Sequence, residues 1–136
     1  MPEELSQGAS TTRRITVDRD RTIDFMGEDC RVYATPELVR DIEMTCRDFI
    51  KAHVPEGEDS VGTRVEIDHT AASLLGMWVD ITVTVSERQG RAISFAFECR
   101  DELEACASGV HNRFIVDVAK TAQRLQAKAA KAKAAR

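Results

Sequence analysis

Apolar residues are spaced in two different ways along this chain of 136 residues. Between residues 36 and 53 they recur every three or four positions and form one stripe, a pattern that predicts an amphipathic helix. Pro55 and Gly57 oppose any continuation of this helix, and after them the period becomes two. A period of two is typical of strands that bury one face.

Four stretches after the helix alternate between apolar and polar residues, and they cover residues 61–70, 77–87, 91–100 and 103–118. Gln89-Gly90 and Asp101-Glu102 fit the short connections of hairpins, and Gly109 predicts a bulge in the last strand. One long helix followed by antiparallel strands predicts an α+β domain whose sheet wraps over the apolar stripe. The open face and edges of such a sheet favour a homo-oligomer.

The two ends of the chain differ from its middle. Residues 1–12 lack a periodic pattern, and we expect a flexible leader there. Residues 13–118, which open with predicted strand segments at 13–18 and 21–25, would form one domain. Residues 119–136 are a basic, Ala- and Lys-rich tail that we expect to be helical.

Charge is divided unevenly between these parts. Residues 119–136 hold six basic side chains and no acidic one, which leaves 13 basic and 23 acidic side chains, a net charge of −10, in residues 1–118. Because an acidic body is a poor general ligand of nucleic acid, we expect no nucleic-acid partner. The basic tail could touch an anion, although a solvated helix is the simpler interpretation.

Composition narrows the class of protein further. With 43% apolar and 31% charged residues, the chain has the composition of a soluble globular protein. No apolar run approaches the ~18 residues of a membrane span, and the first residues lack a signal-peptide pattern. We therefore expect a cytoplasmic protein without a membrane partner. The four cysteines and three histidines show no metal-ligand spacing, so no metal site is expected.

Thr35 opens the predicted helix in the sequence "ATPEL". It is placed as the N-cap, with Pro36 at the first helical position. Capping alone would explain the threonine. A helix N-terminus also offers unpaired N–H groups, here amides such as those of Glu37 and Leu38, and these could hold the oxyanion formed from a thioester carbonyl.

Glu43 lies at the edge of the apolar stripe rather than opposite to it. Two interpretations are open. It could form an i,i+4 ion pair with Arg47, which would be a purely structural role. Alternatively, it could face a cleft between helix and sheet and act there as a base on water or as a carboxylate nucleophile.

His69 lies on the apolar face of its strand, together with Val65 and Ile67. A packed core histidine is one interpretation. However, small residues follow it, beginning with Ala71, and small side chains leave room for a bound ligand, so Ala71 is expected to contact substrate. A hydroxyl, a carboxylate and an imidazole that converge on one cleft would be able to carry out acyl transfer.

Three segments carry a family resemblance: "VYATPELVRDIEM" (32–44), "VGTRVEIDHTAASLLGM" (61–77) and "ASGVHNRFIV" (107–116). Together they resemble the hot-dog fold acyl-CoA thioesterases, in the branch that contains the fluoroacetyl-CoA thioesterase. The resemblance implies a helix wrapped by a curved antiparallel sheet, and a dimer in which two sheets join into one. It also implies that acyl-CoA binds at the dimer interface.

The resemblance further assigns residues to roles. Its threonine, glutamate and histidine fall on Thr35, Glu43 and His69. Gly62 matches a glycine near the acyl end of the pocket, and Arg113 matches an arginine that holds the site or the CoA, although on a strand it could also be a surface charge. Residues 26–31, "MGEDCR", are acidic and contain a glycine where the fluoroacetyl-specific enzyme is aromatic, so the resemblance does not extend to a role in fluoroacetate resistance.

The predicted function is a dimeric, or further paired, hydrolase that cleaves acyl-CoA to free acid and CoA without a cofactor. Glu43 would activate water or attack the carbonyl, His69 would transfer protons, and Thr35 would help to hold the carbonyl oxygen. Three alternatives stay open: an acyl-CoA hydratase or dehydratase of the same fold, a non-catalytic acyl-CoA or small-ligand binding module, and another α+β cone with one helix across its sheet.

Overall fold

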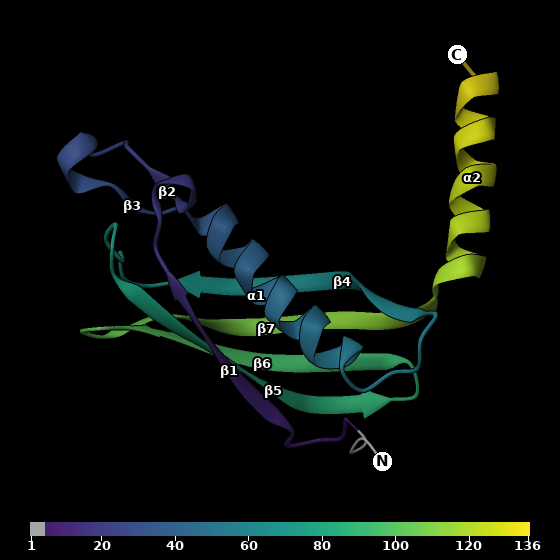
Figure 1. Cartoon of the computed structure of the whole chain (residues 1–136), viewed down its shortest axis with the longest axis horizontal. Coiled ribbons are helices and arrows are strands. Elements are labelled where there is room, and N and C mark those ends of the chain that lie inside the picture. Colours follow the sequence, from purple (N-terminus) through teal and green to yellow (C-terminus); the bar gives the residue numbers. More distant parts are fainter. Residues whose placement is uncertain (1–4) are drawn as a thin grey trace.

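A long helix and a curved antiparallel sheet make up most of the protein (Figure 1). The computed structural model describes residues 5–136. Five strands form the sheet in the order β1-β5-β6-β7-β4: β1 (Ser10–Thr16), β5 (Trp78–Gln89), β6 (Ala92–Asp101), β7 (Ala105–Asp117) and β4 (Glu58–His69). All neighbouring strands are antiparallel. Helix α1 (Thr35–Lys51) lies across one face, so the predicted α+β architecture is confirmed.

Shorter elements surround this frame. Strands β2 (Thr22–Ile23) and β3 (Val32–Tyr33) pair with each other before α1 begins. Two 3-10 turns, η1 (Arg19–Arg21) and η2 (Glu28–Cys30), lie before and between them. The basic tail forms helix α2 (Val118–Ala134), which leaves the sheet at the end of β7. No helix within residues 5–136 is long and apolar enough to cross a membrane.

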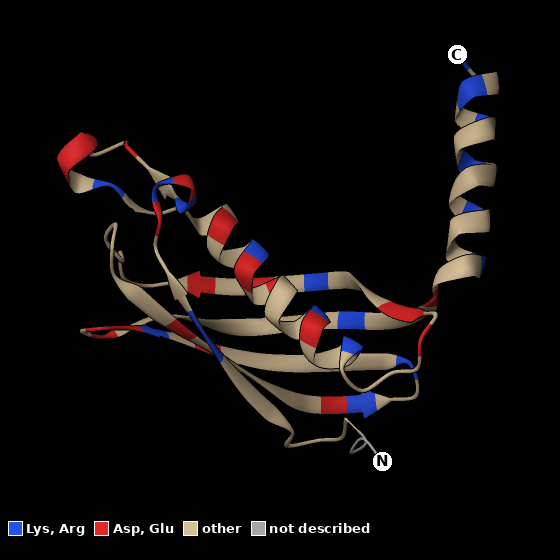
Figure 2. Ribbon diagram, viewed as in Figure 1, with Lys and Arg blue, Asp and Glu red and all other residues tan. Residues whose placement is uncertain are grey.

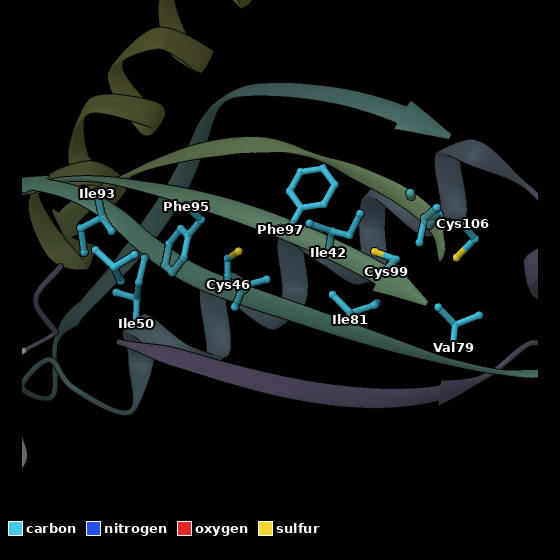
Figure 3. Packing of buried hydrophobic residues seen from close by; sticks show 14 of the residues in the cluster. Ile42, Cys46, Ile50, Val79, Ile81, Ile93, Phe95, Phe97, Cys99 and Cys106 are labelled. Carbon is cyan, nitrogen blue, oxygen red and sulfur yellow. The ribbon is translucent and has the colours of Figure 1, made fainter. Parts of the chain in front are cut away.

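The core lies between α1 and the sheet (Figure 3). Ile42, Cys46 and Ile50 from the apolar stripe of α1 are fully buried. They pack with alternate residues of β5 and β6, among them Ile81 and Phe95. Burial of each large apolar side chain contributes about 1.5–3 kcal/mol. The two sequence periods therefore meet at one interface, which fixes the position of α1 over the sheet.

The domain begins earlier than the predicted boundary at residue 13. Residues 1–4 of the predicted leader lie outside the described residues. Leu5 is buried, however, and Ser10 already belongs to β1. Backbone hydrogen bonds from Gly8 to Val85, and from Val85 to Ala9, extend the pairing with β5 still further towards the N-terminus. Residues without an apolar period can still join an edge ladder, because backbone pairing does not require one.

The predicted bulge near Gly109 is found three residues earlier in the last strand, where Cys106 of β7 is the extra residue opposite the step from Cys99 to Arg100 of β6. Gly109 itself pairs in regular register with Ile67 on one side and Phe97 on the other. A Cβ at position 109 would lie 1.9 Å from the carbonyl oxygen of Glu66. The glycine is required there by the close approach of the neighbouring strand, not by a bulge.

Candidate active site

Thr35 and His69 meet where the start of α1 approaches the end of β4. The Oγ1 atom of Thr35 lies 2.7 Å from Nδ1 of His69, within hydrogen-bond distance. The predicted N-cap role of Thr35 is wrong: Ala34 is the N-cap and α1 begins at Thr35 itself. The hydroxyl of Thr35 therefore forms a hydrogen bond with the imidazole of His69 and does not cap the helix backbone.

A pocket of about 250 Å³ opens beside this pair. It is lined by Ile23, Val32, Tyr33, Thr35, His69, Thr70, Ala71 and Ala72. The small residues after β4 therefore border a cavity, and the amides of Thr70 and Ala71 both donate to the carbonyl of Cys106, which ties this wall to β7. At the start of α1, the Leu38 amide donates to Ala34, so it is not a free donor; the Glu37 amide remains a candidate.

The imidazole of His69 is only partly accessible, and burial lowers its pKa. A neutral ring is therefore favoured at neutral pH. Its Nε2 atom is buried and has no hydrogen-bond partner within residues 5–136. An unpaired buried nitrogen costs about 1–3 kcal/mol. A substrate, a water molecule or a second protomer could supply the missing partner.

Glu43 belongs to a second cluster, further along α1. Its Oε1 atom lies 3.9 Å from Nε2 of His111 and 4.0 Å from Nη1 of Arg113, and 38% of its side chain is exposed. The alternative that Glu43 pairs with Arg47 is wrong, because Arg47 makes a two-pronged contact with Asp59 at 2.6 and 3.1 Å. Glu43 faces the sheet rather than solvent alone.

Arg113 supports this cluster from beneath. It is 6% exposed. Its Nε atom donates to the hydroxyl of Ser60 and its Nη2 atom donates to the carbonyl oxygen of Ser60, both at 2.8 Å. Its Nη1 atom donates to Nε2 of His111 at 3.2 Å, while Nδ1 of His111 donates to the carbonyl of Arg64. His111 must then be neutral, because one ring nitrogen donates and the other accepts. Burial also favours the neutral ring, since it lowers the pKa of His111. Arg113 is therefore not the surface charge that remained one interpretation of the sequence.

Gly62 allows the carboxylate of Glu43 to approach β4. A Cβ at this position would lie 2.7 Å from Oε1 of Glu43 and 3.2 Å from Cε1 of His111. Real Cβ atoms do not approach this closely, so any other residue would displace the carboxylate. The glycine that the resemblance placed near the acyl end of the pocket thus lies against Glu43.

The two clusters are separate within one protomer. Gly62 lies against Glu43, and His69 is seven residues further along β4, which is roughly 20 Å of extended strand. The structure brings Thr35 and His69 together, and separately brings Glu43 together with Gly62 and Arg113. The three predicted catalytic side chains do not converge in a single chain.

A network that the sequence did not reveal holds the wall of the pocket. Asp41 accepts hydrogen bonds from the hydroxyl of Tyr33 and from Nε and Nη2 of Arg21, the latter two at 2.8 and 3.1 Å. Burial and the Asp41 carboxylate raise the pKa of Tyr33. These contacts fasten the β2–β3 pair to α1. Isolated polar residues in three segments give no common sequence signal, whereas the alternation of β7 could have placed His111 on the same face as Arg113.

Within residues 5–136, no group of three or more His, Cys, Asp or Glu side chains is arranged to hold a metal ion. All four cysteines are free thiols.

Comparison with known proteins identifies the family. A family model described as fluoroacetyl-CoA-specific thioesterase (FlK) matches residues 17–119. The chain belongs to this family. A curated relative, the fluoroacetyl-CoA thioesterase of Streptantibioticus cattleyicolor, is 30% identical over 89 residues, which span 65% of this chain and 64% of the relative, less than two thirds of its length.

Solved structures extend the likeness to almost the whole chain. A thioesterase superfamily member from Thermus thermophilus is 26% identical with a TM-score of 0.86, covering 96% of this chain and 97% of that one. A mutant of FlK in complex with fluoroacetate and CoA is also 26% identical, with a TM-score of 0.78 over 85% of this chain and 98% of that chain. The predicted hot-dog thioesterase fold is confirmed.

Proposed function

We propose that this FlK-family protein is a dimeric thioesterase that hydrolyses an acyl-CoA thioester to free acid and CoA. The observation that carries the proposal is the Thr35–His69 pair at the start of α1, beside a pocket and with one imidazole nitrogen left unpaired. Membership of a family named for a CoA thioesterase supports the same chemistry. We also keep the cytoplasm as the proposed compartment, because its reducing conditions suit four free cysteines.

The complete site forms, in this proposal, between two protomers. Strand β4 is an edge of the sheet, and residues 61–66 are exposed along it, including Val61 and Val65. Exposed apolar edge strands favour pairing with another chain. If two copies of β4 pair antiparallel about a twofold axis at Val65, Val65 lies opposite its own copy and His69 of each chain lies opposite residues 61–62 of the other. Glu43 of one protomer would then approach His69 of the next.

The chemistry follows from the groups so assembled. The acyl carbonyl would lie at the positive end of α1, where the Glu37 amide and the Thr35 hydroxyl can stabilise an oxyanion. Glu43 would either take a proton from the attacking water or attack the carbonyl carbon itself. As the carbon–sulfur bond breaks, the proton that Glu43 took from water would pass to the neutral His69, and His69 would give it to the departing thiolate. Both groups then return to their starting protonation states. Arg113 and His111 would keep Glu43 in place rather than contact substrate.

Within one protomer, the pocket beside His69 has a volume of about 250 Å³, and the partner subunit would close it in the dimer. The acidic η2 turn, which contains Glu28 and Asp29, lies in the chain between Ile23 and Val32, two residues of the pocket wall. We propose acyl-CoAs as the substrate class, with Ala71 in contact with the acyl chain.

Thiol release from a panel of acyl-CoAs tests the proposal. Glu43→Gln and His69→Ala should each lower kcat by about 10²–10⁴-fold, because each removes a group that moves a proton in the reaction. Glu98→Gln, an exposed carboxylate on β6, is the matched control and should leave kcat unchanged. Retention of the parent rate by Glu43→Gln would contradict the proposal. So would hydration of an enoyl-CoA without release of thiol, which would indicate a hydratase.

A further inference from the structure

Helix α2 extends beyond the edge of its own sheet. It begins directly after β7, where the side chain of Asp117 accepts a hydrogen bond from the Lys120 amide and the Val118 amide donates to Gly57. Figure 1 shows α2 running past β4 and away from the other four strands. With 17 residues, it is about 25 Å long, or roughly five strand spacings. It therefore reaches into the space where a second sheet paired at β4 would lie.

Two faces of α2 differ in character. Its apolar face turns towards β4, where Val118, Ala122 and Leu125 line a groove with Val61 and Val116. At 100° per residue, the basic residues Lys120, Arg124, Lys128 and Lys131 fall within about 80° of one another and form a stripe to one side of that face. Figure 2 shows basic residues along α2 and no acidic residue on it.

The basic stripe is not neutralised by its own chain. Within residues 5–136, none of these four side chains lies within ion-pair distance of a carboxylate. Like charges four residues apart weaken a helix, and a cation in the first turn, such as Lys120, opposes the helix dipole. A stripe that is unfavourable for the isolated helix becomes favourable when an anion with several charges lies along it.

The position of the stripe suggests which anion. In the β4 pairing proposed above, the start of one β4 lies beside residues 70–72 of the other chain, and these residues line the pocket next to His69. Because α2 begins beside Glu58 at the start of β4, its stripe would stand near the mouth of the partner's pocket. An acyl-CoA carries its diphosphate and 3′-phosphate at the far end of a long pantetheine arm, away from the thioester.

We propose that the basic stripe of α2 binds the phosphates of an acyl-CoA whose thioester lies in the pocket of the partner subunit. This inference rests on the proposed function. Each site would then use Thr35 and His69 of one chain, and Glu43 and α2 of the other. The otherwise acidic body has few free cations for a substrate with several negative charges, and α2 supplies them.

The double substitution Lys120→Glu/Arg124→Glu tests the stripe. It should raise KM for acetyl-CoA by roughly tenfold or more with little change in kcat, and it should abolish most of the salt dependence of KM. KM for acetyl-pantetheine, which lacks the diphosphate and 3′-phosphate, should not change. Lys133→Glu/Arg136→Glu, which reverses two charges outside the stripe, is the matched control. Equal KM values for the two variants would overturn the proposal, and circular dichroism checks that α2 stays helical.

Direct binding separates this inference from the proposed hydrolysis. Calorimetry with free CoA should show weaker binding to the stripe variant than to the control variant. If the parent protein releases no thiol from any acyl-CoA but the stripe variant alone loses CoA binding, hydrolysis is refuted and the stripe proposal stands. Unchanged CoA binding in the stripe variant, or tighter binding of duplex DNA than of CoA by the parent protein, would overturn the stripe proposal.

Mixed dimers test the exchange between subunits. In a dimer of one His69→Ala chain and one Glu43→Gln chain, the intact site uses Glu43 of the first chain. Charge reversal of the stripe on that chain should raise KM for acetyl-CoA, and the same reversal on the other chain should not. The opposite pattern would overturn the assignment of α2 to the partner's site.

Discussion

Gly62 illustrates how a single atom can govern the candidate site. Its missing Cβ leaves the space that Oε1 of Glu43 occupies, and His111 and Arg113 close the same space from β7. Arg113 in turn is held by both oxygens of Ser60. The carboxylate of Glu43 is thus enclosed by residues of β4 and β7, which is the kind of support that keeps a reacting group in position.

Gly62→Ala should lower kcat by about 10–100-fold, because a displacement of roughly 1 Å at a reacting group has effects of this size. The melting temperature should change little, since position 62 is exposed. The double variant Gly62→Ala/Glu43→Asp, in which the shorter side chain withdraws the carboxylate, should be no worse than Gly62→Ala alone. Parent activity in Gly62→Ala would show that the position of Glu43 is unimportant.

The pH dependence follows from His69. Burial lowers its pKa below the ordinary value of 6.5, so the neutral, reactive ring persists to lower pH than in a free histidine. The value of kcat/KM should therefore be constant above pH 7 and decline only below about pH 6.5. A decline centred above that pH would contradict the neutral assignment.

The stability of the fold, like kcat/KM, should decrease as the pH falls below about 6.5. The folded state resists protonation of His69 and His111, whereas the unfolded state takes up those protons at the ordinary pKa. The unfolded state thus binds more protons below about pH 6.5, and the free energy of unfolding should decrease as pH falls through that region. Urea titrations at several pH values measure this slope, and His111→Asn should reduce it.

The sequence predicted which single residues belong to the candidate site better than it predicted which side chains they contact. The local patterns around Thr35 and His69 were enough to nominate them, because a helix start and a strand end are local features. The sequence could not predict that Thr35 bonds to His69 rather than capping α1, since that contact joins residues 34 positions apart. The Asp41 network was missed for the same reason: its three members lie in different segments.

Helices and strands were predicted well where the periodic stretch of sequence was long. Strands β5 and β6 and helix α1 were found within a few residues, because each has one buried face. Strand β2 lies within the predicted segment 21–25, but β3 and its pairing with β2 were not predicted, because two-residue strands carry no period. This pair owes its position to side chains: Tyr33 and Arg21 converge on Asp41 of α1, and the pair forms a wall of the pocket.

Asp41→Ala tests the role of that network. It would leave the Tyr33 hydroxyl and the Arg21 guanidinium without their acceptor, so the free energy of unfolding should fall by about 1–3 kcal/mol. KM for acyl-CoA should also rise, because the pocket wall would no longer be fastened to α1. Asp24→Ala removes an exposed carboxylate that lies 3.9 Å from Arg31, and serves as the control. Equal urea midpoints for the two variants would contradict this role.

At the scale of the whole molecule, the separation of the two clusters has the largest consequence. Thr35 and His69 lie at one end of β4, and Glu43 lies over Gly62 towards its other end. An antiparallel pairing of two β4 strands reverses these ends and brings each half-site towards its complement. One protomer would therefore be inactive, and activity should fall when the dimer is diluted to monomer.

Activity of purified mixed dimers tests the account most directly. A His69→Ala chain and a Glu43→Gln chain, co-expressed with different tags and isolated as the mixed dimer, form one site with both residues intact and one with neither. The account predicts about half of the parent activity per dimer, while each variant alone stays nearly inactive. A mixed dimer no more active than its two parents would show that Glu43 and His69 do not act across the interface.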